Sequence, residues 1–259
     1  MTDRDTPDHV LLTFDGPIAQ ISFNRPARRN ALSPNLLTLL RDYLTQVAAS
    51  DARVLILRGE GQDFCVGADM YDQPDQEIPF HHDELMSFYH TGTMLHEMSA
   101  VTIAAIDGGC AGPGMAWAAA CDFRFASLRA VFNTAFLAVG VAGEMGLAWT
   151  LNRILGSGRA RELLFFPERM NAAKAEQIGF VTRTFDTSES LYAGALEAAR
   201  QLAARDPLTL KVAKANILAA ENLILRDFVE VESGRHILLA SREARTEAFS
   251  AYAAKRKME

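Results

Sequence analysis

The amino-acid sequence predicts an α/β fold followed by an all-helical C-terminal region. Two apolar runs, residues 54–57 (VLIL) and 101–106 (VTIAAI), are typical of strands that helices cover on both faces. Helical patterns alternate with strand patterns through residues 1–187, whereas the pattern from Ser188 onward is helical only. We therefore expect a core over residues 1–187 and a separate helical region over residues 188–259.

The first expected elements are a hairpin and a capped helix. Residues 10–14 and 18–23 have the composition of strands, and Asp15-Gly16 between them is a common hairpin turn. Ser33-Pro34 is typical of the cap and first residue of a helix. The predicted apolar stripe of this helix comprises Leu36, Leu40, Tyr43, Leu44 and Val47.

Further elements follow in order along the chain. One helix is expected over residues 83–98, and the strand at 101–106 ends in a glycine-rich loop at residues 107–114. A helix of small residues then runs to Ala120, and residues 122–126 form a strand. Later helices are expected to begin near Gly146, at residues 157–162 and after the cap Asn171, the last of these ending at Gly179.

Composition excludes several classes of protein. The chain has 259 residues, 49% of them hydrophobic and 22% charged, as in ordinary globular proteins. A net charge of -6 argues against nucleic-acid binding, and we find no apolar run of about 18 residues that would span a membrane. The three cysteines, Cys65, Cys110 and Cys121, show no CxxC spacing and predict buried reduced thiols in a cytoplasmic protein.

Glu144 lies in an apolar, glycine-punctuated segment, VGVAGEMGL, that holds no other charge. A carboxyl group in an apolar pocket has a raised pKa and can exchange protons near neutral pH. The alternative is a structural glutamate stabilised by the dipole of the helix that begins near Gly146. The local sequence leaves both interpretations open.

Several blocks together resemble the enoyl-CoA hydratase/isomerase (crotonase) superfamily. Each block is weak alone, but they occur in the family's order and spacing over nearly the whole chain. The matching blocks are residues 24–32 (NRPARRNAL), 64–70 (FCVGADM), 104–108 (AAIDG), 121–122 (CD), 170–181 (MNAAKAEQIGFV) and 253–257 (AAKRK).

The resemblance implies a spiral of ββα turns over residues 1–187, with C-terminal helices that form a trimer, often paired into a hexamer. It implies an acyl-CoA substrate whose thioester oxygen becomes an enolate held by two backbone N–H groups. Coenzyme A would enter as part of the substrate, with no separate cofactor, metal, nucleic acid or membrane partner. Such pre-aimed donors stabilise developing negative charge without reorganisation.

The sequence departs from the family's hydratases at both of their acidic positions. Ala116 and Phe136 stand where those enzymes place the two glutamates that split water. Residues 140–144 are similar to the segment where dienoyl-CoA isomerases and 4-chlorobenzoyl-CoA dehalogenases carry a catalytic aspartate. The dehalogenases need a tryptophan at position 136, and dienoyl isomerases carry a second acid there. An isomerase in which Glu144 shuttles one proton is the simplest chemistry that remains.

The predicted oxyanion donors are also incomplete. The N–H of Ala68 matches the first donor, but the second falls on Pro113, which has no N–H. Gly112, Gly114 or an ordered water would have to replace it, or the chemistry differs from that of a thioester enolate. The alternatives are therefore a hydrolase or lyase of C–C or β-dicarbonyl bonds on the same fold, or a CoA-binding protein with little turnover.

The resemblance also assigns residues to coenzyme A. Arg28 and Arg29 would pair with phosphates, for which the guanidinium geometry is apt; the alternative is a solvated loop. The other assigned residues are Ala31, Val66, Ala68, Asp69, Met70, Phe249 and Lys257. The last two would close over CoA from a neighbouring subunit, and the alternative is an ordinary basic C-terminus.

Four histidines cluster on the helix that caps the acyl pocket in the family: His81, His82, His90 and His96. Their spacing does not match a metal site. A solvated helix surface is the favoured interpretation, and a second proton carrier from this set or from Tyr89 is the alternative.

Overall fold

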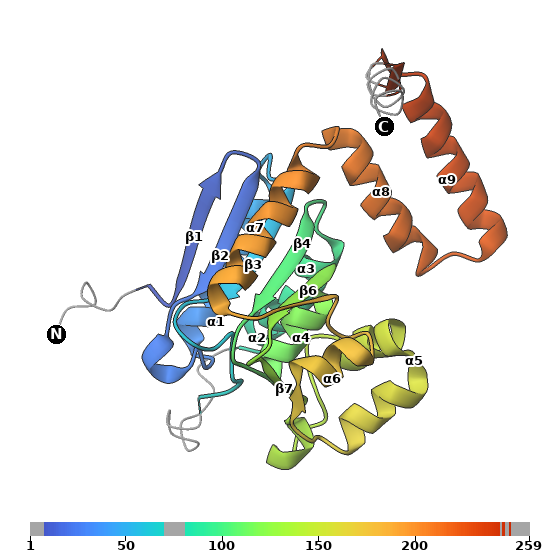
Figure 1. Ribbon diagram of the computed structural model, residues 1–259. Coiled ribbons are helices and arrows are strands. Elements are labelled where there is room, and N and C mark those ends of the chain that lie inside the picture. The colour runs from blue at the N-terminus through green and yellow to red at the C-terminus, as the bar shows by residue number, and fades with distance from the viewer. Residues whose placement is uncertain (1–7, 70–80, 244, 247–248, 250–259) are drawn as a thin grey trace.

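The structure is a computed structural model that describes residues 8–69, 81–243, 245–246 and 249. Its larger sheet has six strands in the order β1-β2-β3-β4-β6-β9. The first pair is antiparallel and the later pairs are parallel. The strands are β1 (Val10–Asp15), β2 (Ile18–Phe23), β3 (Val54–Gly59), β4 (Val101–Ile106), β6 (Phe123–Ser127) and β9 (Arg183–Phe185). Figure 1 labels β1, β2, β3, β4 and β6.

A second, smaller sheet lies beside the first and carries part of the candidate site. It orders β5 (Gly109–Ala111), β7 (Val131–Asn133) and β8 (Met170–Asn171). A single bridge from Cys65 to Cys110 joins a neighbouring loop to this sheet, and another bridge joins Leu32 to Ala68. The sequence did not reveal these strands or β9, because runs of two or three residues are too short to show a period of two.

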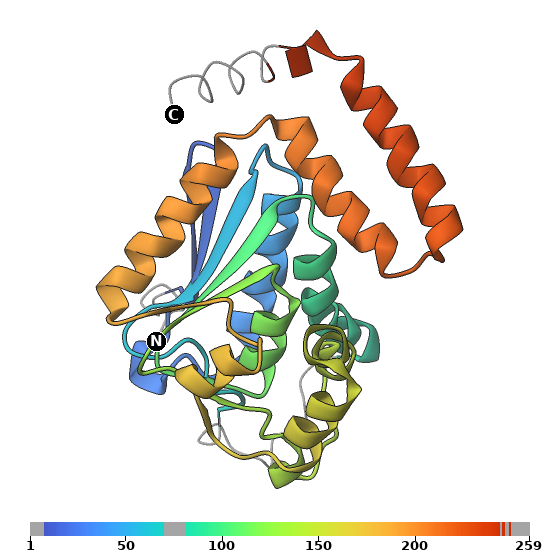
Figure 2. The ribbon, with the colours of Figure 1, turned by 45° about the vertical axis from the view of Figure 1, so that its right-hand side comes forward.

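Side chains of the central strands alternate between two apolar layers. Leu55 and Leu57 point to the layer that contains α1 (Pro34–Ala48) and α4 (Pro113–Ala120). Val54 and Ile56 point to the opposite layer, which α7 (Ser188–Ala203) covers. Figure 2 shows α7 on one side of the sheet and α1 and α4 on the other. The predicted two-sided burial of these strands is therefore confirmed.

Local signals placed α1 correctly. The Ser33 hydroxyl accepts a hydrogen bond from the N–H of Leu36, and Pro34 is the first helical residue. Four residues of the predicted stripe are fully or almost fully buried, while Tyr43 is partly buried. Each buried leucine contributes roughly 1.5–3 kcal/mol relative to an exposed one.

The expected helix over residues 83–98 is in fact two helices, α2 (His82–Tyr89) and α3 (Thr91–Glu97). The Thr91 hydroxyl donates to the carbonyl of Phe88, and it also accepts the indole N–H of Trp117. Such a side-chain bond to the preceding turn competes with the helical backbone pattern. The break could not be predicted from the local sequence, because Thr91 and Trp117 are far apart along the chain.

Two later helix boundaries agree with the sequence. In α5 (Leu147–Phe165), Gly156 has non-helical angles (φ 75°, ψ 159°), so a new helical segment begins there. Asn171 caps α6 (Ala172–Gln177) by accepting from the N–H of Lys174, and Gly179 has the positive φ of a helix end.

The C-terminal helices divide into two parts. Helix α7 buries Leu191, Ala195 and Ala199 against the large sheet and so packs as part of the core. Helices α8 (Pro207–Ala220) and α9 (Leu225–Ala240) extend away from it (Figure 1). The buried Lys214 anchors α8, since its ammonium group donates to Asp122 at 2.7 Å and to the carbonyl of Ala100 at 2.8 Å.

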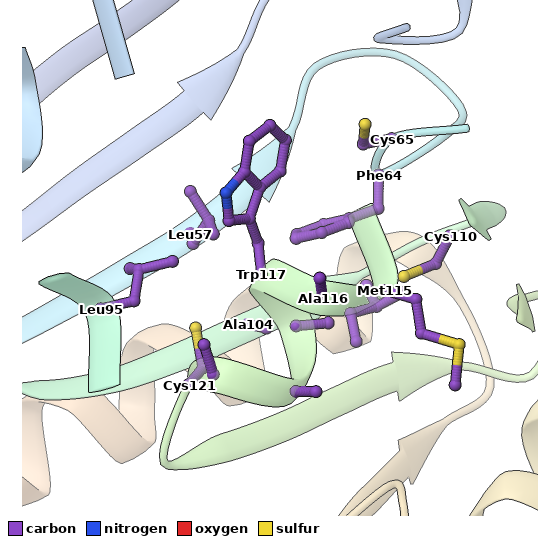
Figure 3. Packing of buried hydrophobic residues seen from close by; sticks show 14 of the residues in the cluster. Leu57, Phe64, Cys65, Leu95, Ala104, Cys110, Met115, Ala116, Trp117 and Cys121 are labelled. Carbon is purple, nitrogen blue, oxygen red and sulfur yellow. The ribbon is translucent and has the colours of Figure 1, made fainter. Parts of the chain in front are cut away.

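The core around α4 is dense and includes the three cysteines. Figure 3 shows Trp117, Phe64 and Leu57 packed together, with Cys65, Cys110 and Cys121 in the same cluster. The Trp117 ring stacks on Phe23 with centroids 5.1 Å apart. All three thiols are free and buried, as predicted. Within the described residues, no helix is both long enough and apolar enough to cross a membrane.

Candidate active site

Ala68 presents a free backbone donor. It follows Gly67 (φ 98°), whose carbonyl accepts from the N–H of Leu32. Ala68 is exposed, and its own N–H makes no hydrogen bond within the part of the chain that the structure describes. This is the arrangement expected of an oxyanion donor.

Residues 112–114, which we call the oxyanion loop, lie beside Ala68. A β-carbon added at Gly67 would lie 3.7 Å from Cδ of Pro113, so Pro113 lies beside the segment that carries Ala68. Pro113 is also the first residue of α4, where its missing N–H costs the helix nothing.

One glycine of the oxyanion loop already uses its donor. The N–H of Gly112 donates to the carbonyl of Asn133 at 3.0 Å, so Gly112 is not a substitute donor in this structure. The N–H groups of Gly114 and Gly67 face the Cys65 thiol. Burial raises the pKa of this thiol to about 12, and the two N–H groups oppose the rise. Gly112 therefore does not replace the second donor that the resemblance implies.

The two residues expected at the acidic positions of the family's hydratases, Ala116 and Phe136, are both buried apolar side chains. Ala116 in α4 is fully buried. Phe136 opens the short 3-10 helix Phe136–Val139 and is 6% exposed. Its ring lies between two glycines: a β-carbon at Gly112 would lie 4.0 Å from the ring, and one at Gly143 would lie 3.9 Å from it.

Glu144 lies next to Gly143, in residues 140–146, which we call the acid loop. Gly140, Gly143, Met145 and Gly146 all have positive φ there. Left-handed backbone suits glycine but strains methionine, so the chain is held in this shape by its contacts. Burial raises the pKa of the Glu144 carboxyl. Among the described residues, no hydrogen-bond or ionic partner holds that carboxyl.

The position of Glu144 bears on its two interpretations. Helix α5 begins at Leu147 with Gly146 as its cap, so Glu144 precedes the first turn. A helix dipole alone would lower the pKa of the carboxyl, whereas burial raises it. A raised pKa is what the proton-carrier interpretation expects, and the catalytic role of Glu144 stays a prediction.

The charge of Glu144 raises the pKa of two other groups. Burial raises the pKa of Tyr89, and the Glu144 carboxylate raises it further; the same charge adds to the rise at Cys65. Exposed apolar side chains continue the surface next to Phe136: Leu137, Val139 and Val141. The site thus has an apolar wall and one acid.

The predicted CoA residue Arg29 lines a cavity of about 560 Å³ together with Val66. Arg29 makes a bidentate contact with Asp63, with distances of 2.9 and 3.0 Å. Arg129 and Arg169 line the same cavity, and sequence reasoning missed both. Arg129 follows β6 and Arg169 precedes β8, so only the fold brings them together.

The remaining predicted CoA residues are placed differently. Arg28 is exposed. Ala31 is buried, and its carbonyl accepts from Arg25, which also pairs with Asp69 at 3.0 Å. Phe249, beyond α9, is 65% exposed. Met70 and Lys257 lie outside the described residues.

The histidines do not gather around Glu144. His81, His82 and His90 are exposed. His96 instead contacts Glu221, the residue directly after α8, at 2.8 Å. No group of three potential metal ligands occurs among the described residues. In the predicted set of four histidines and Tyr89, the Glu144 carboxylate raises the pKa of Tyr89.

Comparison with known proteins agrees with this geometry. The model of the enoyl-CoA hydratase/isomerase family matches residues 13–259. Over 251 residues the chain is 31% identical to the enoyl-CoA isomerase/hydratase fer4 of Mycosarcoma maydis, covering 93% of this chain and 91% of that protein. It is 32% identical over 201 residues to 4-chlorobenzoyl coenzyme A dehalogenase-2 of Arthrobacter, covering 76% and 72%.

A solved structure extends the likeness to three dimensions. The enoyl-CoA hydratase of Bacillus anthracis superposes with a TM-score of 0.88 at 28% identity, covering 95% of this chain and 96% of that one. The expected crotonase fold, an α/β spiral with C-terminal helices, is thereby confirmed. The chain belongs to the enoyl-CoA hydratase/isomerase family of enzymes that act on CoA thioesters.

Proposed function

We propose that the protein is an enoyl-CoA isomerase that moves one proton through Glu144. One observation carries the proposal: Glu144 is a partly buried carboxyl with a raised pKa and no partner among the described residues. An acid in this state accepts and returns protons near neutral pH.

The proposed reaction starts from a β,γ-unsaturated acyl-CoA. The Glu144 carboxylate removes a proton from the α-carbon, and the C–H electron pair moves into the thioester to form a dienolate. Protonated Glu144 then returns the proton to the γ-carbon, so that the double bond ends between the α- and β-carbons. The carboxylate is regenerated, and neither water nor a cofactor is consumed.

Ala68 would stabilise the dienolate oxygen through its free N–H. Pro113 has no N–H and the N–H of Gly112 is already bonded, and each oxyanion donor is worth about 3 kcal/mol of transition-state stabilisation in other enzymes. We therefore expect an isomerase slower than members of the family with two donors.

The nucleotide part of CoA would bind in the cavity lined by Arg29, Val66, Arg129 and Arg169. Guanidinium groups match phosphate oxygens in geometry and charge. Arg29 and Arg129 each already face a carboxylate, Asp63 and Asp107, so Arg169 would be the additional cation.

The test uses β,γ-hexenoyl-CoA in deuterated buffer with the Glu144→Gln variant. Wild type should move the double bond and incorporate deuterium at the α- or γ-carbon. Glu144→Gln should lose roughly 10²–10⁴-fold in rate while keeping its affinity for CoA, because general acid/base catalysis contributes about that much. Glu97→Gln, which changes an exposed glutamate at the end of α3, is the matched control. A loss of less than about fivefold in Glu144→Gln would sink the proposal.

A second function is favoured by one observation, the missing donor at Pro113. A hydrolase or lyase of C–C or β-dicarbonyl bonds would need a different oxyanion arrangement. Turnover of a free β-diketone, with no deuterium exchange in enoyl-CoA, would support it. Tight CoA binding with neither reaction would indicate a binding protein instead.

The C-terminal helices support a proposal of assembly as a trimer or a dimer of trimers. Large apolar side chains on α8, α9 and their connection are exposed in the single chain: Ile217, Leu223, Ile224, Leu225, Val229, Ile237 and Leu238. Covering them removes apolar area from water. Phe249 would then lie near the CoA of a neighbouring subunit. Light scattering at micromolar concentration should give three or six chains, and a monomer would contradict this.

A further inference from the structure

Helix α3 approaches the acid loop with no side chain in between. A β-carbon built on the buried Gly92 would lie 2.4 Å from the carbonyl oxygen of Met145, and 3.3 Å from its carbonyl carbon and its Cβ. Real β-carbons essentially never come within 3.0 Å of another heavy atom. The obstacle is backbone, so no side-chain rotation can relieve it.

The helix is the fixed partner in this contact. Thr91 accepts the indole N–H of Trp117 at 2.9 Å and donates to the carbonyl of Phe88 at 2.6 Å. Trp117 is fully buried and stacks on Phe23. Moving α3 would therefore disturb the centre of the core, where packing is dense and displacement is costly.

The acid loop is the less buried partner, although Met145 itself is 7% exposed and packs in the core. Most of residues 140–146 are exposed, and four of the seven have positive φ. Any added group at position 92 would push the Met145 carbonyl outward. The peptide bonds on both sides of Met145 would turn, and one of them joins it directly to Glu144.

We infer that Gly92 is a positioning residue for Glu144: its missing side chain lets α3 hold the Met145 carbonyl and thereby sets the place of the carboxyl. This inference rests on the proposed role of Glu144 as acid/base. It assigns a function to a residue that touches neither the carboxyl nor the substrate.

The experiment compares Gly92→Ala with Gly158→Ala on β,γ-hexenoyl-CoA. Gly158 is the matched control, because it also lies in a helix and a β-carbon there would meet nothing within 4 Å. Gly92→Ala should lower kcat by roughly 10- to 100-fold, since misplacing a catalytic group by about 1 Å costs up to 10²-fold. KM and the Kd for free CoA should stay within about twofold.

The pH–rate profile separates positioning from general damage. Displacement of Glu144 toward water should move the apparent pKa of the essential carboxyl down toward its ordinary value in Gly92→Ala, and not in Gly158→Ala. A Gly92→Ala protein with the kcat and pH profile of wild type would overturn the inference. If Glu144→Gln keeps the wild-type rate, the proposed function fails, whatever Gly92→Ala does.

A second variant covers the case in which Gly92→Ala does not fold. Gly92→Ala combined with Met145→Gly gives residue 145 the freedom to turn its carbonyl away, and Met145→Gly alone carries the same loss of the buried Met145 side chain. Its kcat should still fall well below that of Met145→Gly alone. Equal rates for those two proteins would also overturn the inference.

Discussion

The oxyanion loop and the acid loop flank the same phenylalanine, Phe136, and they are built in opposite ways. In the oxyanion loop the N–H of Gly112 is bonded, that of Gly114 faces the Cys65 thiol, and the residues are buried. In the acid loop most residues are exposed, the backbone is left-handed at four positions, and the carboxyl of Glu144 has no partner among the described residues.

This difference indicates that the oxyanion loop contributes mainly to the stability of the fold and the acid loop mainly to the proposed reaction. Bonded and buried backbone contributes to folding, and little of it remains free to act on a substrate. A strained, half-exposed loop contributes little to folding, but it can hold a carboxyl in the unsatisfied state that proton transfer needs. Substitutions in the oxyanion loop should therefore lower the free energy of unfolding, and substitutions in the acid loop should lower the catalytic rate.

The largest expected effect is the absence of hydration. Each water-handling acid of a hydratase is worth roughly 10²–10⁴-fold, and here Ala116 and Phe136 fill both positions. Turnover of crotonyl-CoA to the hydroxy product should lie far below a typical kcat of about 10 s⁻¹. The rate is measured from the loss of enoyl absorbance. A hydration rate at that level would show that the acid loop also supports the addition of water.

Pro113→Gly should raise activity if the oxyanion loop lacks a donor. The new N–H would join that of Ala68, and a well-placed donor is worth on the order of 10²–10³-fold in kcat. We expect a gain of at least about tenfold on β,γ-hexenoyl-CoA, measured as kcat at saturating substrate. A change smaller than that would mean that a side chain or water already supplies the second donor.

Gly114→Ala and Gly140→Ala test the contrast in stability directly. A β-carbon at Gly114 would lie 2.4 Å from the carbonyl oxygen of Cys65, whereas one at Gly140 would meet nothing within 4 Å. Gly114→Ala should lower the free energy of unfolding by about 3 kcal/mol through overpacking. Gly140→Ala should cost only about 1 kcal/mol, the strain of a positive φ. Similar midpoints in urea for both variants would break the comparison.

The smallest effect concerns the stability cost of the acid. Burial raises the pKa of Glu144 above its ordinary value of 4.5, so the folded protein binds this proton more tightly than the unfolded chain does. As pH rises from that value through the raised pKa, the folded state therefore loses stability. Glu144→Gln should have the higher Tm at neutral pH, and the difference should disappear at acidic pH. A lower Tm at neutral pH would mean that the carboxylate has a stabilising partner.

Local signals sufficed for much of the fold. Ser33, Pro34, Asn171 and Gly179 mark helix ends through contacts within a few residues, which the sequence displays. The break at His90 and the strands β5, β7 and β8 depend on partners distant in sequence, such as Trp117 for Thr91.

The same distinction holds for the candidate site. Glu144 could be identified as a candidate from the sequence because it is an isolated charge in an apolar segment. Pro113 could be identified because proline lacks an N–H. Arg129, Arg169 and Gly92 carry no local mark, because their importance arises from the cavity or close contact that the folded chain creates.

Because the cysteines are buried, their reaction with alkylating reagents would report when the surrounding structure opens. The thiolate is the reactive form of cysteine, and burial raises the pKa of Cys65 and of Cys121 to about 12. Alkylating reagents should therefore spare the native protein and modify each thiol only while its surroundings are open. Cys65 lies against the oxyanion loop, whereas Cys121 lies at the far end of α4. The ratio of their labelling rates would tell a local breathing of the site from a global unfolding, without any introduced probe.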